Sequence, residues 1–315
     1  MKSRNLVTAC MATALLLGAC QSENENSSDA GSASEPKTVT DGVGNEVTIP
    51  NQPERIIGSY LEDPLVTLGV TPVVQWSVAS RESTQVYLEE YLEGIDPIDS
   101  VLPLEAVMDA EPDLIFAPGE TSLQSGDYEQ YNSIAPTYVL DQETADDWRA
   151  ALTEIGEVLG LEDKAAEALA TYDARVAEVK EALNEKIGDS KVAAVWVIGG
   201  DFYVVAPDVA SGAVLFEDLE LEPANAIANL PEDAGAHWNP ISLEALAELD
   251  ADYLFLVDGD PDTIESLKSE AIWSGIPAVE QGNVFEVSGK SSWLYNGYQA
   301  NMQTIDSVYE HIIGE

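Results

Sequence analysis

Two stretches of the chain, which begin at Leu104 and Leu243, have almost the same sequence. The first reads LEAVMDAEPDLIF and the second reads LEALAELDADYLF, so that Leu, Glu, Ala, Asp and Phe coincide in register. Each pattern predicts a short helix, a turn through an Asp and an apolar strand, over 114–117 in one copy and 253–257 in the other. Such units recur in many α/β proteins, but one unit built twice favours two similar lobes with a cleft between them.

Helices and strands alternate on both sides of a helical block. Residues 38–145 and 189–315 each predict an α/β lobe with a doubly wound, mainly parallel sheet, and 38–50 predicts a β-hairpin at the start of the first lobe. The block, 146–188, predicts a helix over 146–159 that ends at Gly160, and a second over 162–187 that ends at Gly188. At 1.5 Å per residue the second helix would be roughly 39 Å long. A single helix of that length can join the lobes and fix their spacing.

The N-terminus resembles the signal peptide and lipobox of bacterial lipoproteins. Lys2 and Arg4 precede an apolar run over 6–17, and Leu17-Gly18-Ala19-Cys20 closes it. The resemblance implies that residues 1–19 are removed and that Cys20 carries the lipid. Residues 20–37 then form a polar, disordered tether that holds the protein on the outer face of the cell membrane, as in a Gram-positive bacterium. An ordinary signal peptide cut at a small-x-small site is the alternative.

Charge and cysteine content exclude several classes of protein. With 13 Lys and Arg against 58 Asp and Glu, the chain has a net charge of −45 and is a poor partner for nucleic acid or anionic lipid. Cys10 lies in the signal sequence, so Cys20 is the one cysteine that remains after cleavage. Disulfides, cysteine-based zinc sites and cysteine nucleophiles are therefore excluded.

Several segments, in this order, resemble the substrate-binding lipoproteins of iron–siderophore ABC importers, a periplasmic-binding-protein-like family with a rigid helix between its lobes. The segments are VxDxxGNxVxIP and PxRII over 39–57, EPDLI over 111–115, ISLE over 241–244, WSGIPAV over 273–279 and GNVFEV over 282–287. The resemblance covers 38–313. It implies a monomeric binding protein, not an enzyme, which has no cofactor, captures a ferric siderophore and delivers it to a dimeric permease.

In this family, equivalent glutamates on the two lobes bind arginines of the permease. The resemblance gives that role to Glu105 and Glu244, the second residues of the two repeats. Two carboxylates at matched places on a rigid body could set its register on a twofold permease, because charge pairs enclosed in an interface can be strongly coupled. The alternative is that both are solvated side chains stabilised by the helix dipole.

Ligands of open α/β sheets bind beyond the carboxyl ends of the strands, so the loops after the predicted strands hold the candidate contacts. Aromatic side chains in these loops would bind a bulky, partly apolar ligand. The expected ligand contacts are Tyr60, Trp76, Arg81, Trp196, Trp238, Trp293 and Tyr295. Trp148 and Trp273 lie on helical patterns, and we expect them to pack the core.

The small number of basic residues near these loops narrows the class of ligand that the cleft can bind. The family's catecholate ligands are trianionic and its hydroxamate ligands nearly neutral, while this chain has only Arg81 and Lys290 in reach of the cleft. Hydroxamates are favoured, although hydroxamate-binding members often have an Arg where this chain has Val101 or Ile198. Cobalamin or haem on the same fold is the alternative.

Other classes of function find little support in the sequence. Direct capture of Zn or Mn needs several imidazoles, and the chain has only His237 and His311. A secreted hydrolase could use a pair of carboxylates, but the chain has no Gly-x-Ser-x-Gly, phosphate loop or histidine base. A purely adhesive surface lipoprotein is a further alternative.

Overall fold

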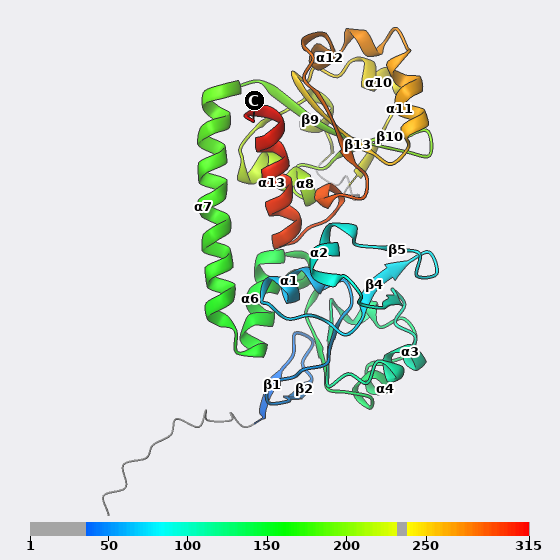
Figure 1. Cartoon of the computed structure of the whole chain (residues 1–315), viewed down its shortest axis with the longest axis vertical. Helices are drawn as coiled ribbons and strands as arrows, with labels where there is room; N and C mark the ends of the chain where they lie inside the picture. Colours follow the sequence, from blue (N-terminus) through cyan, green and yellow to red (C-terminus); the bar gives the residue numbers. More distant parts are fainter. Residues whose placement is uncertain (1–35, 232–237, 315) are drawn as a thin grey trace, which may run out of the picture. The chain divides into compact units, whose positions relative to one another are not determined.

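The part of the chain from Lys37 to Leu159 forms an α/β lobe with three small sheets (Figure 1). The computed structural model describes residues 36–231 and 238–314. The strands of this lobe are β1 (Lys37–Thr40), β2 (Glu46–Ile49), β3 (Ile56–Gly58), β4 (Gln75–Val78), β5 (Ser83–Thr84), β6 (Pro97–Asp99), β7 (Leu114–Ala117) and β8 (Thr137–Val139). Its helices are α1 (Glu62–Thr67), η1 (Val86–Leu88), α2 (Glu89–Leu92), α3 (Leu104–Asp109), η2 (Glu120–Ser122), α4 (Tyr128–Asn132), α5 (Gln142–Asp146) and α6 (Trp148–Leu159). The strands β3, β7 and β8 pair in parallel, and β1 and β2 form the predicted hairpin.

The second lobe begins at Lys191 and is built on one larger sheet. Its strands are β9 (Lys191–Ile198), β10 (Asp201–Val205), β11 (Glu222–Pro223), β12 (Trp238–Ile241), β13 (Tyr253–Asp258) and β14 (Val284–Ser288). Its helices are α8 (Ala210–Gly212), η3 (Ala213–Asp218), α9 (Asn225–Ala228), α10 (Leu243–Ala247), α11 (Pro261–Lys268), η4 (Trp273–Gly275), α12 (Pro277–Gln281), η5 (Ser292–Leu294) and α13 (Tyr298–Ile312). The sheet order is β12-β10-β9-β13-β14, with β11 also on β9.

The second sheet is parallel at its centre and has core on both faces. The strands β9, β13 and β14 pair in parallel, whereas a turn through Gly199 and Gly200 makes β10 antiparallel to β9. Along β9, Val192 and Ala194 belong to one buried cluster, and Ala193 and Val195 to another. Alternate side chains of a strand point to opposite faces, so both faces of this sheet are covered. The prediction of a doubly wound lobe is confirmed, with β10 and β12 as an antiparallel addition.

The two copies of the sequence repeat fold into the same unit. In each copy a short helix, α3 or α10, leads into a strand with parallel neighbours on both sides, β7 or β13. The Asp of each copy binds the start of a neighbouring strand. The carboxylate of Asp113 accepts the backbone N–H groups of Glu54 at 2.8 Å and Arg55 at 3.0 Å, and that of Asp252 accepts the N–H of Lys191 at 2.9 Å. The repeated Asp therefore fixes the register of parallel strands in both lobes.

The long helix α7 (Glu162–Ile187) has the predicted bounds and joins the lobes. Gly160, with a φ of 69°, ends α6 in the left-handed conformation, and Gly188 follows the last residue of α7. Ala165 packs in the core of the first lobe, whereas Leu183 packs in the core of the second. The helix is therefore fastened at both ends, as the sequence predicts.

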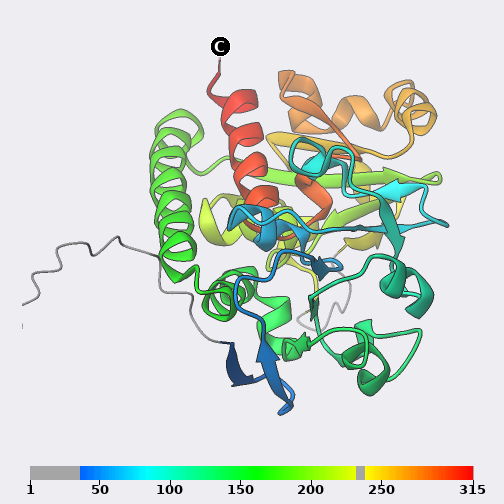
Figure 2. The ribbon, with the colours of Figure 1, turned by 60° about the horizontal axis from the view of Figure 1, so that its bottom comes forward.

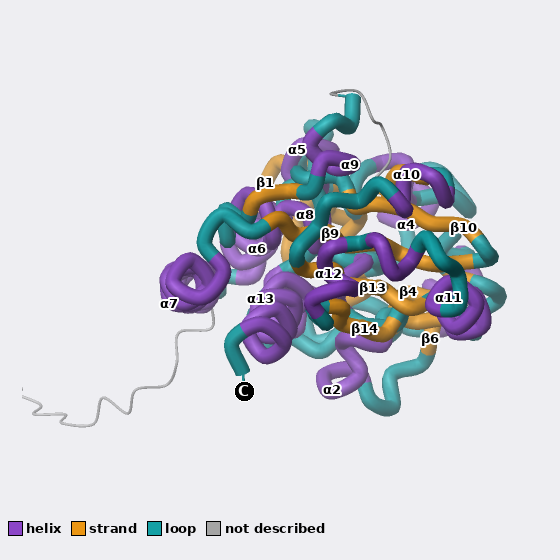
Figure 3. The backbone as a smooth tube through the Cα atoms, turned by 90° about the horizontal axis from the view of Figure 1, so that it is seen from above, coloured by secondary structure: helices purple, strands orange, loops and turns teal. Residues whose placement is uncertain are grey.

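A second connection between the lobes comes from α13, which lies beside α7 in all three views (Figure 1, Figure 2 and Figure 3). The first turn of α13 inserts between elements of the first lobe. Ala300 is fully buried in a cluster with Val66, Tyr87, Leu88 and Leu92. The lobes are thus held together by two helices, of which the sequence analysis found one.

The tether expected over 20–37 overlaps β1, because Lys37 already pairs with Ile49. The expected signal peptide, 1–19, and Cys20 lie outside the described residues. Within the described ranges, no helix is long and apolar enough to cross a membrane.

Candidate ligand-binding site

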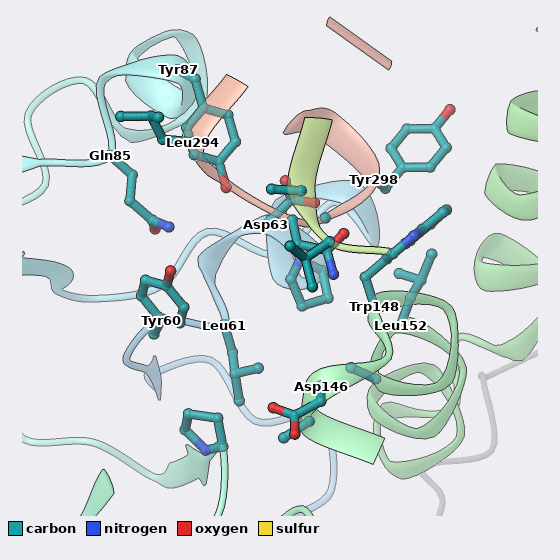
Figure 4. Close-up of a pocket in the computed structure, with 18 of the residues that line it drawn as sticks. Tyr60, Leu61, Asp63, Gln85, Tyr87, Asp146, Trp148, Leu152, Leu294 and Tyr298 are labelled. Atoms are coloured by element: carbon teal, nitrogen blue, oxygen red, sulfur yellow. The ribbon is translucent and has the colours of Figure 1, made fainter. Parts of the chain in front are cut away.

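A pocket of about 320 Å³ lies where α1, α6 and the start of α13 meet (Figure 4). Both lobes contribute to it, because α1 and α6 belong to the first and α13 to the second. Its volume is at the lower end of the range typical of small-molecule sites. The lining residues are Tyr60, Leu61, Asp63, Pro64, Gln85, Tyr87, Pro118, Ala145, Asp146, Trp148, Ala151, Leu152, Asp208, Val209, Ala210, Leu294, Asn296, Gly297 and Tyr298.

Two of the lining loops follow parallel strands of the first lobe. Tyr60 follows β3, and Pro118 follows β7. The carboxyl ends of parallel strands are the usual place for a ligand in an open α/β sheet. Tyr60 also has a left-handed backbone, with a φ of 64°, which is uncommon for a residue other than glycine and is found preferentially at functional sites.

One wall of the pocket is aromatic and spans both lobes. Trp148 begins α6 and Tyr298 begins α13, and each packs against core clusters of both lobes. The ring of Trp148 lies 4.8 Å from that of Tyr172 and 6.4 Å from that of Tyr298, centroid to centroid. The guanidinium of Arg149 lies 4.7 Å from the centroid of Trp148 and pairs with Asp173 at 2.9 Å. These contacts fix the indole, which gives the pocket a rigid apolar face.

Two buried carboxyl groups, Glu62 and Asp63, begin α1, and Asp63 lines the pocket. The carboxylate of Asp63 accepts the backbone N–H groups of Gln299 at 3.0 Å and Ala300 at 3.1 Å, in the first turn of α13. Oε1 of Glu62 accepts the N–H of Trp76 at 2.6 Å, and its Oε2 has no partner among the described residues. Burial raises the pKa of Glu62 to about 8 and that of Asp63 to about 6, although the backbone N–H groups oppose both shifts. Asp63 thus connects α1 to α13 across the lobe boundary.

Replacing Gly297 by alanine is expected to weaken this connection. An added Cβ would lie 2.5 Å from Cγ of Asp63, whose carboxylate is held by two N–H groups and has little room to move. We expect urea-induced unfolding to show a loss of about 1–3 kcal/mol, as for other overpacked sites. Gly275→Ala is the control, because its Cβ would meet nothing within 4 Å. Equal stability of the two variants would contradict this account of the connection.

Among the expected contacts, Tyr60 lines the pocket and two others, Trp76 and Tyr295, lie close to its lining residues. Trp76 packs edge-on against Tyr60, with 5.1 Å between ring centroids. Tyr295 packs against Tyr87, which lines the pocket, at 4.8 Å. Trp76, Tyr60 and Tyr295 therefore belong to one neighbourhood, as the loop analysis expects, and their contact with ligand stays a prediction.

Trp196 and Trp238 form a separate aromatic pair on the second sheet. Their ring centroids are 5.8 Å apart in an edge-on arrangement, and neither indole N–H has an acceptor among the described residues. Trp196 lines a second hollow together with Lys290 rather than the pocket between the lobes. His237, which precedes Trp238 in the sequence, lies outside the described residues.

Trp293 and Arg81 do not line the pocket. Trp293 is 1% exposed, and its ring packs 4.7 Å from that of Phe255 in the core of the second lobe, so its position gives it a packing role. Arg81 is exposed in the loop between β4 and β5. Trp273 is 7% exposed and packs in the core, in agreement with the expectation for it.

Trp148 packs against the core, as its helical pattern predicts, and it also lies in the wall of the pocket. The helix predicted over 146–159 begins two residues later, because Asp147 caps α6 by accepting the N–H groups of Arg149 and Ala150 and separates it from α5, which ends at Asp146. The break puts Trp148 in the first turn of α6, beside the pocket. Asp147 directly before the periodic run is the signal that could have shown this start.

Glu105 and Glu244 occupy equivalent places on the two repeat units. Each is the second residue of its helix and is exposed to solvent. Figure 1 shows α3 and α10 on the side away from α7. Neither carboxylate takes part in a salt bridge or a side-chain hydrogen bond with a described residue, so both are free to meet a partner.

The described residues contain no group of three His, Cys, Asp or Glu side chains that could hold a metal ion. The pair Glu62 and Asp63 alone is too small a set of oxygen ligands for iron or calcium. A metal bound in this pocket would thus have to bring its own ligands.

Comparisons with known proteins place the whole described fold in one group. Residues 59–290 match the family model described as periplasmic binding protein. The iron(3+)-hydroxamate-binding protein FhuD of Bacillus subtilis is 29% identical over 285 residues, which cover 87% of either chain. The probable siderophore-binding lipoprotein YfiY of the same bacterium is 25% identical over 311 residues, or 95% of this chain and 94% of that protein.

Solved structures agree on the fold. A FhuD-fold binding protein of a ferrichrome ABC transporter from Bacillus subtilis has a TM-score of 0.70 and 25% identity. The match covers 87% of this chain and 99% of that protein's chain. FhuD2 of Staphylococcus aureus with bound ferrioxamine B has a TM-score of 0.67 and 20% identity. The match covers 82% of this chain and 98% of the FhuD2 chain. The predicted fold, two α/β lobes joined by a long helix, is confirmed.

Proposed function

The chain belongs to the periplasmic binding protein family, and we propose that it captures a ferric siderophore outside the cell and delivers it to an ABC importer. The observation that carries this proposal is the pocket between the lobes, which offers aromatic side chains to an organic ligand and has no cluster of metal-binding side chains among the described residues. Iron would enter it already chelated. A binding protein of this family performs no chemistry on its ligand, so an enzyme is not proposed.

A hydroxamate-type siderophore fits the pocket better than a catecholate. No Lys, Arg or His is among the described lining residues, so nothing there would compensate a trianionic complex. Relatives named for hydroxamate binding support the same choice. The ligand would pack against the rings of Trp148, Tyr298, Tyr60 and Tyr87.

The protein would bind its ligand with little closure of the lobes, as a monomer. The helix α7 fastens both cores, and the carboxylate of Asp63 binds the first turn of α13. Opening the lobes would break these hydrogen bonds and expose the buried Ala300. Recognition by the permease would then depend on surface groups, of which Glu105 and Glu244 are our candidates.

We also propose that the protein is a lipoprotein of the cell membrane. The lipobox before Cys20 and a relative described as a lipoprotein support this placement. Two acyl chains on Cys20 would anchor the protein at the outer leaflet, where one chain alone would be marginal.

Titration of the protein with ferric chelates tests the proposed function. We expect ferric hydroxamates to quench tryptophan fluorescence with a dissociation constant below about 1 μM, because Trp148 lines the pocket. Catecholates, ferric citrate, haem and cobalamin are the comparison ligands. Trp148→Ala should weaken hydroxamate binding roughly tenfold, and Trp148→Phe, which keeps an aromatic face, should weaken it less.

The result that would overturn the proposal is the absence of quenching by any iron chelate below micromolar concentrations. Tight binding of haem or cobalamin alone would redirect the function within the family. If the Trp148→Ala variant shows the same quenching as the unmodified protein, the ligand binds outside this pocket.

A further inference from the structure

The charged side chains that line the pocket are all acidic. Asp63, Asp146 and Asp208 contribute three carboxyl groups, and the described lining contains no basic residue. The net charge of −45 makes acidic surfaces common on this chain. Asp63 is buried, whereas Asp146 and Asp208 are exposed to solvent, so the attraction of these two for a charge on the ligand is partly screened.

Two of these carboxylates are available to a ligand, and each comes from a different lobe. Asp63 is occupied by the first turn of α13. Asp146 ends α5 in the first lobe, and one of its oxygens accepts a hydrogen bond from Gln142 at 2.8 Å. Asp208 lies between β10 and α8 in the second lobe, and its side chain makes no hydrogen bond or salt bridge with a described residue. A ligand between the lobes would meet negative charge from both sides.

The pocket also contains an unpartnered oxygen that calls for a hydrogen-bond donor. Gln85 is 6% exposed, lines the pocket, and has an Oε1 that accepts no hydrogen bond from the described residues. In Figure 4 the amide of Gln85 points to the space between Tyr60 and Tyr87. A buried acceptor without a donor lowers stability, so a ligand N–H placed here would be favoured.

No basic side chain of the described residues lines the pocket beside these carboxylates. Arg149, which follows Trp148, pairs with Asp173 at 2.9 Å and does not line the pocket. Lys290 lines the second hollow near Trp196. A ligand with a positively charged N–H group would supply both a countercharge for these carboxylates and a donor for Gln85.

We infer that the pocket, with carboxylates from both lobes and a buried unpartnered amide oxygen, selects siderophore complexes that carry a positively charged amine. This inference rests on the proposed function and names the class of ligand for the same site. Binding of anionic complexes is disfavoured by the same carboxylates, which makes the acidic lining a device for specificity as well as affinity. An ammonium group supplies a positive countercharge for Asp146 and Asp208. It also supplies N–H donors for the amide oxygen of Gln85.

Ferrioxamine B and its N-acetylated form are suitable probes, because they differ in one ammonium group and share the iron centre. We expect the full-length protein to bind ferrioxamine B about five- to tenfold more tightly than the acetylated form at low salt, which corresponds to one or two partly exposed charge pairs. The ratio should shrink towards one in 1 M NaCl, since salt screens such pairs.

Variants of the chain show which carboxylates are responsible. Asp146→Asn with Asp208→Asn should reduce the ratio to about one without weakening the acetylated form. Asp109→Asn with Asp189→Asn, at two exposed positions outside the pocket lining, removes the same two charges and should leave the ratio unchanged. Equal affinity for the two probes in the unmodified protein would overturn the inference while leaving the proposed function in place. So would a ratio that survives in the double variant. If no ferric chelate binds at all, the proposed function fails as well.

Discussion

Cells that carry Glu105→Ala and Glu244→Ala together are expected to lose siderophore uptake, while the purified double variant binds ligand as before. Both carboxylates are exposed at the second position of a helix, one on each lobe, and neither contributes to the pocket. Charge pairs enclosed in protein interfaces have shown coupling of roughly 1.5–7 kcal/mol. Loss of two such pairs, even at about 1.5 kcal/mol each, would weaken docking more than about 100-fold.

The expected pattern of single variants follows from the two lobes. A permease with two equivalent halves would hold one glutamate in each, so each single variant should retain partial uptake and the double variant almost none. Uptake of radiolabelled ferric hydroxamate by cells that express each variant at equal level measures this. Fluorescence titration of the same purified variants shows whether binding is intact.

A matched control exists on the same molecule. Glu129 is the exposed second residue of α4 in the first lobe, and Asp262 is the exposed second residue of α11 in the second. Glu129→Ala with Asp262→Ala removes the same charge from the same kind of position. If uptake is normal both in this control and in the Glu105 and Glu244 double variant, the two glutamates do not dock onto the permease. Loss of uptake in both would point to net charge instead.

The parts of the fold that depend on local sequence were predictable. The helix over 162–187 has a continuous helical pattern and is bounded by glycines, so that its ends coincide with those observed. The two repeat units combine a helix pattern with a strand pattern in a fixed order, and both folded as predicted. Periodicity and end signals act over a few residues and can be read without knowledge of the tertiary structure.

The composition of the pocket could not be predicted in the same way. Glu62 and Asp63 are acidic residues at a helix start in a chain with 58 acidic residues, and nothing local marks them as buried. They are buried because α13, more than 230 positions later, brings the N–H groups of Gln299 and Ala300 to Asp63. Likewise, Trp293 follows a strand as a binding residue might, yet it packs against Phe255 in the core. Contacts between distant segments decide both cases.

Glu62→Gln is expected to make the protein more stable at alkaline pH and to leave its stability at pH 4.5 nearly unchanged. The side chain of Glu62 is fully buried, and burial raises its pKa from 4.5 to about 8. Glutamine has the shape of the protonated carboxyl group and can keep the hydrogen bond from the N–H of Trp76. It cannot ionise, so the variant avoids placing a charge in this site.

The direction of this pH dependence follows from the pKa of Glu62 in the folded protein and its pKa in the unfolded chain. The folded state holds the proton up to about pH 8, whereas the unfolded chain releases it near pH 4.5. The stabilisation from this proton is therefore complete below pH 4.5 and is lost as the pH rises through 8, at about 1.4 kcal/mol per pH unit. Over that range the wild-type protein should lose on the order of 4 kcal/mol that the variant retains.

Urea unfolding followed by tryptophan fluorescence at pH 4.5, 6.5 and 8.5 measures the difference. Asp63, whose pKa is raised to about 6, adds a pH dependence of the same sign, but it is present in both proteins and cancels in the comparison. Glu82→Gln, at an exposed position, should show no such gain. If Glu62→Gln is destabilising by the same amount at all three pH values, the carboxyl group is charged in the folded protein and the burial argument is wrong. A gain confined to alkaline pH would show that the contact between α1 and β4, where Glu62 accepts the N–H of Trp76, is built around a protonated acid, one residue before the carboxylate that binds α13.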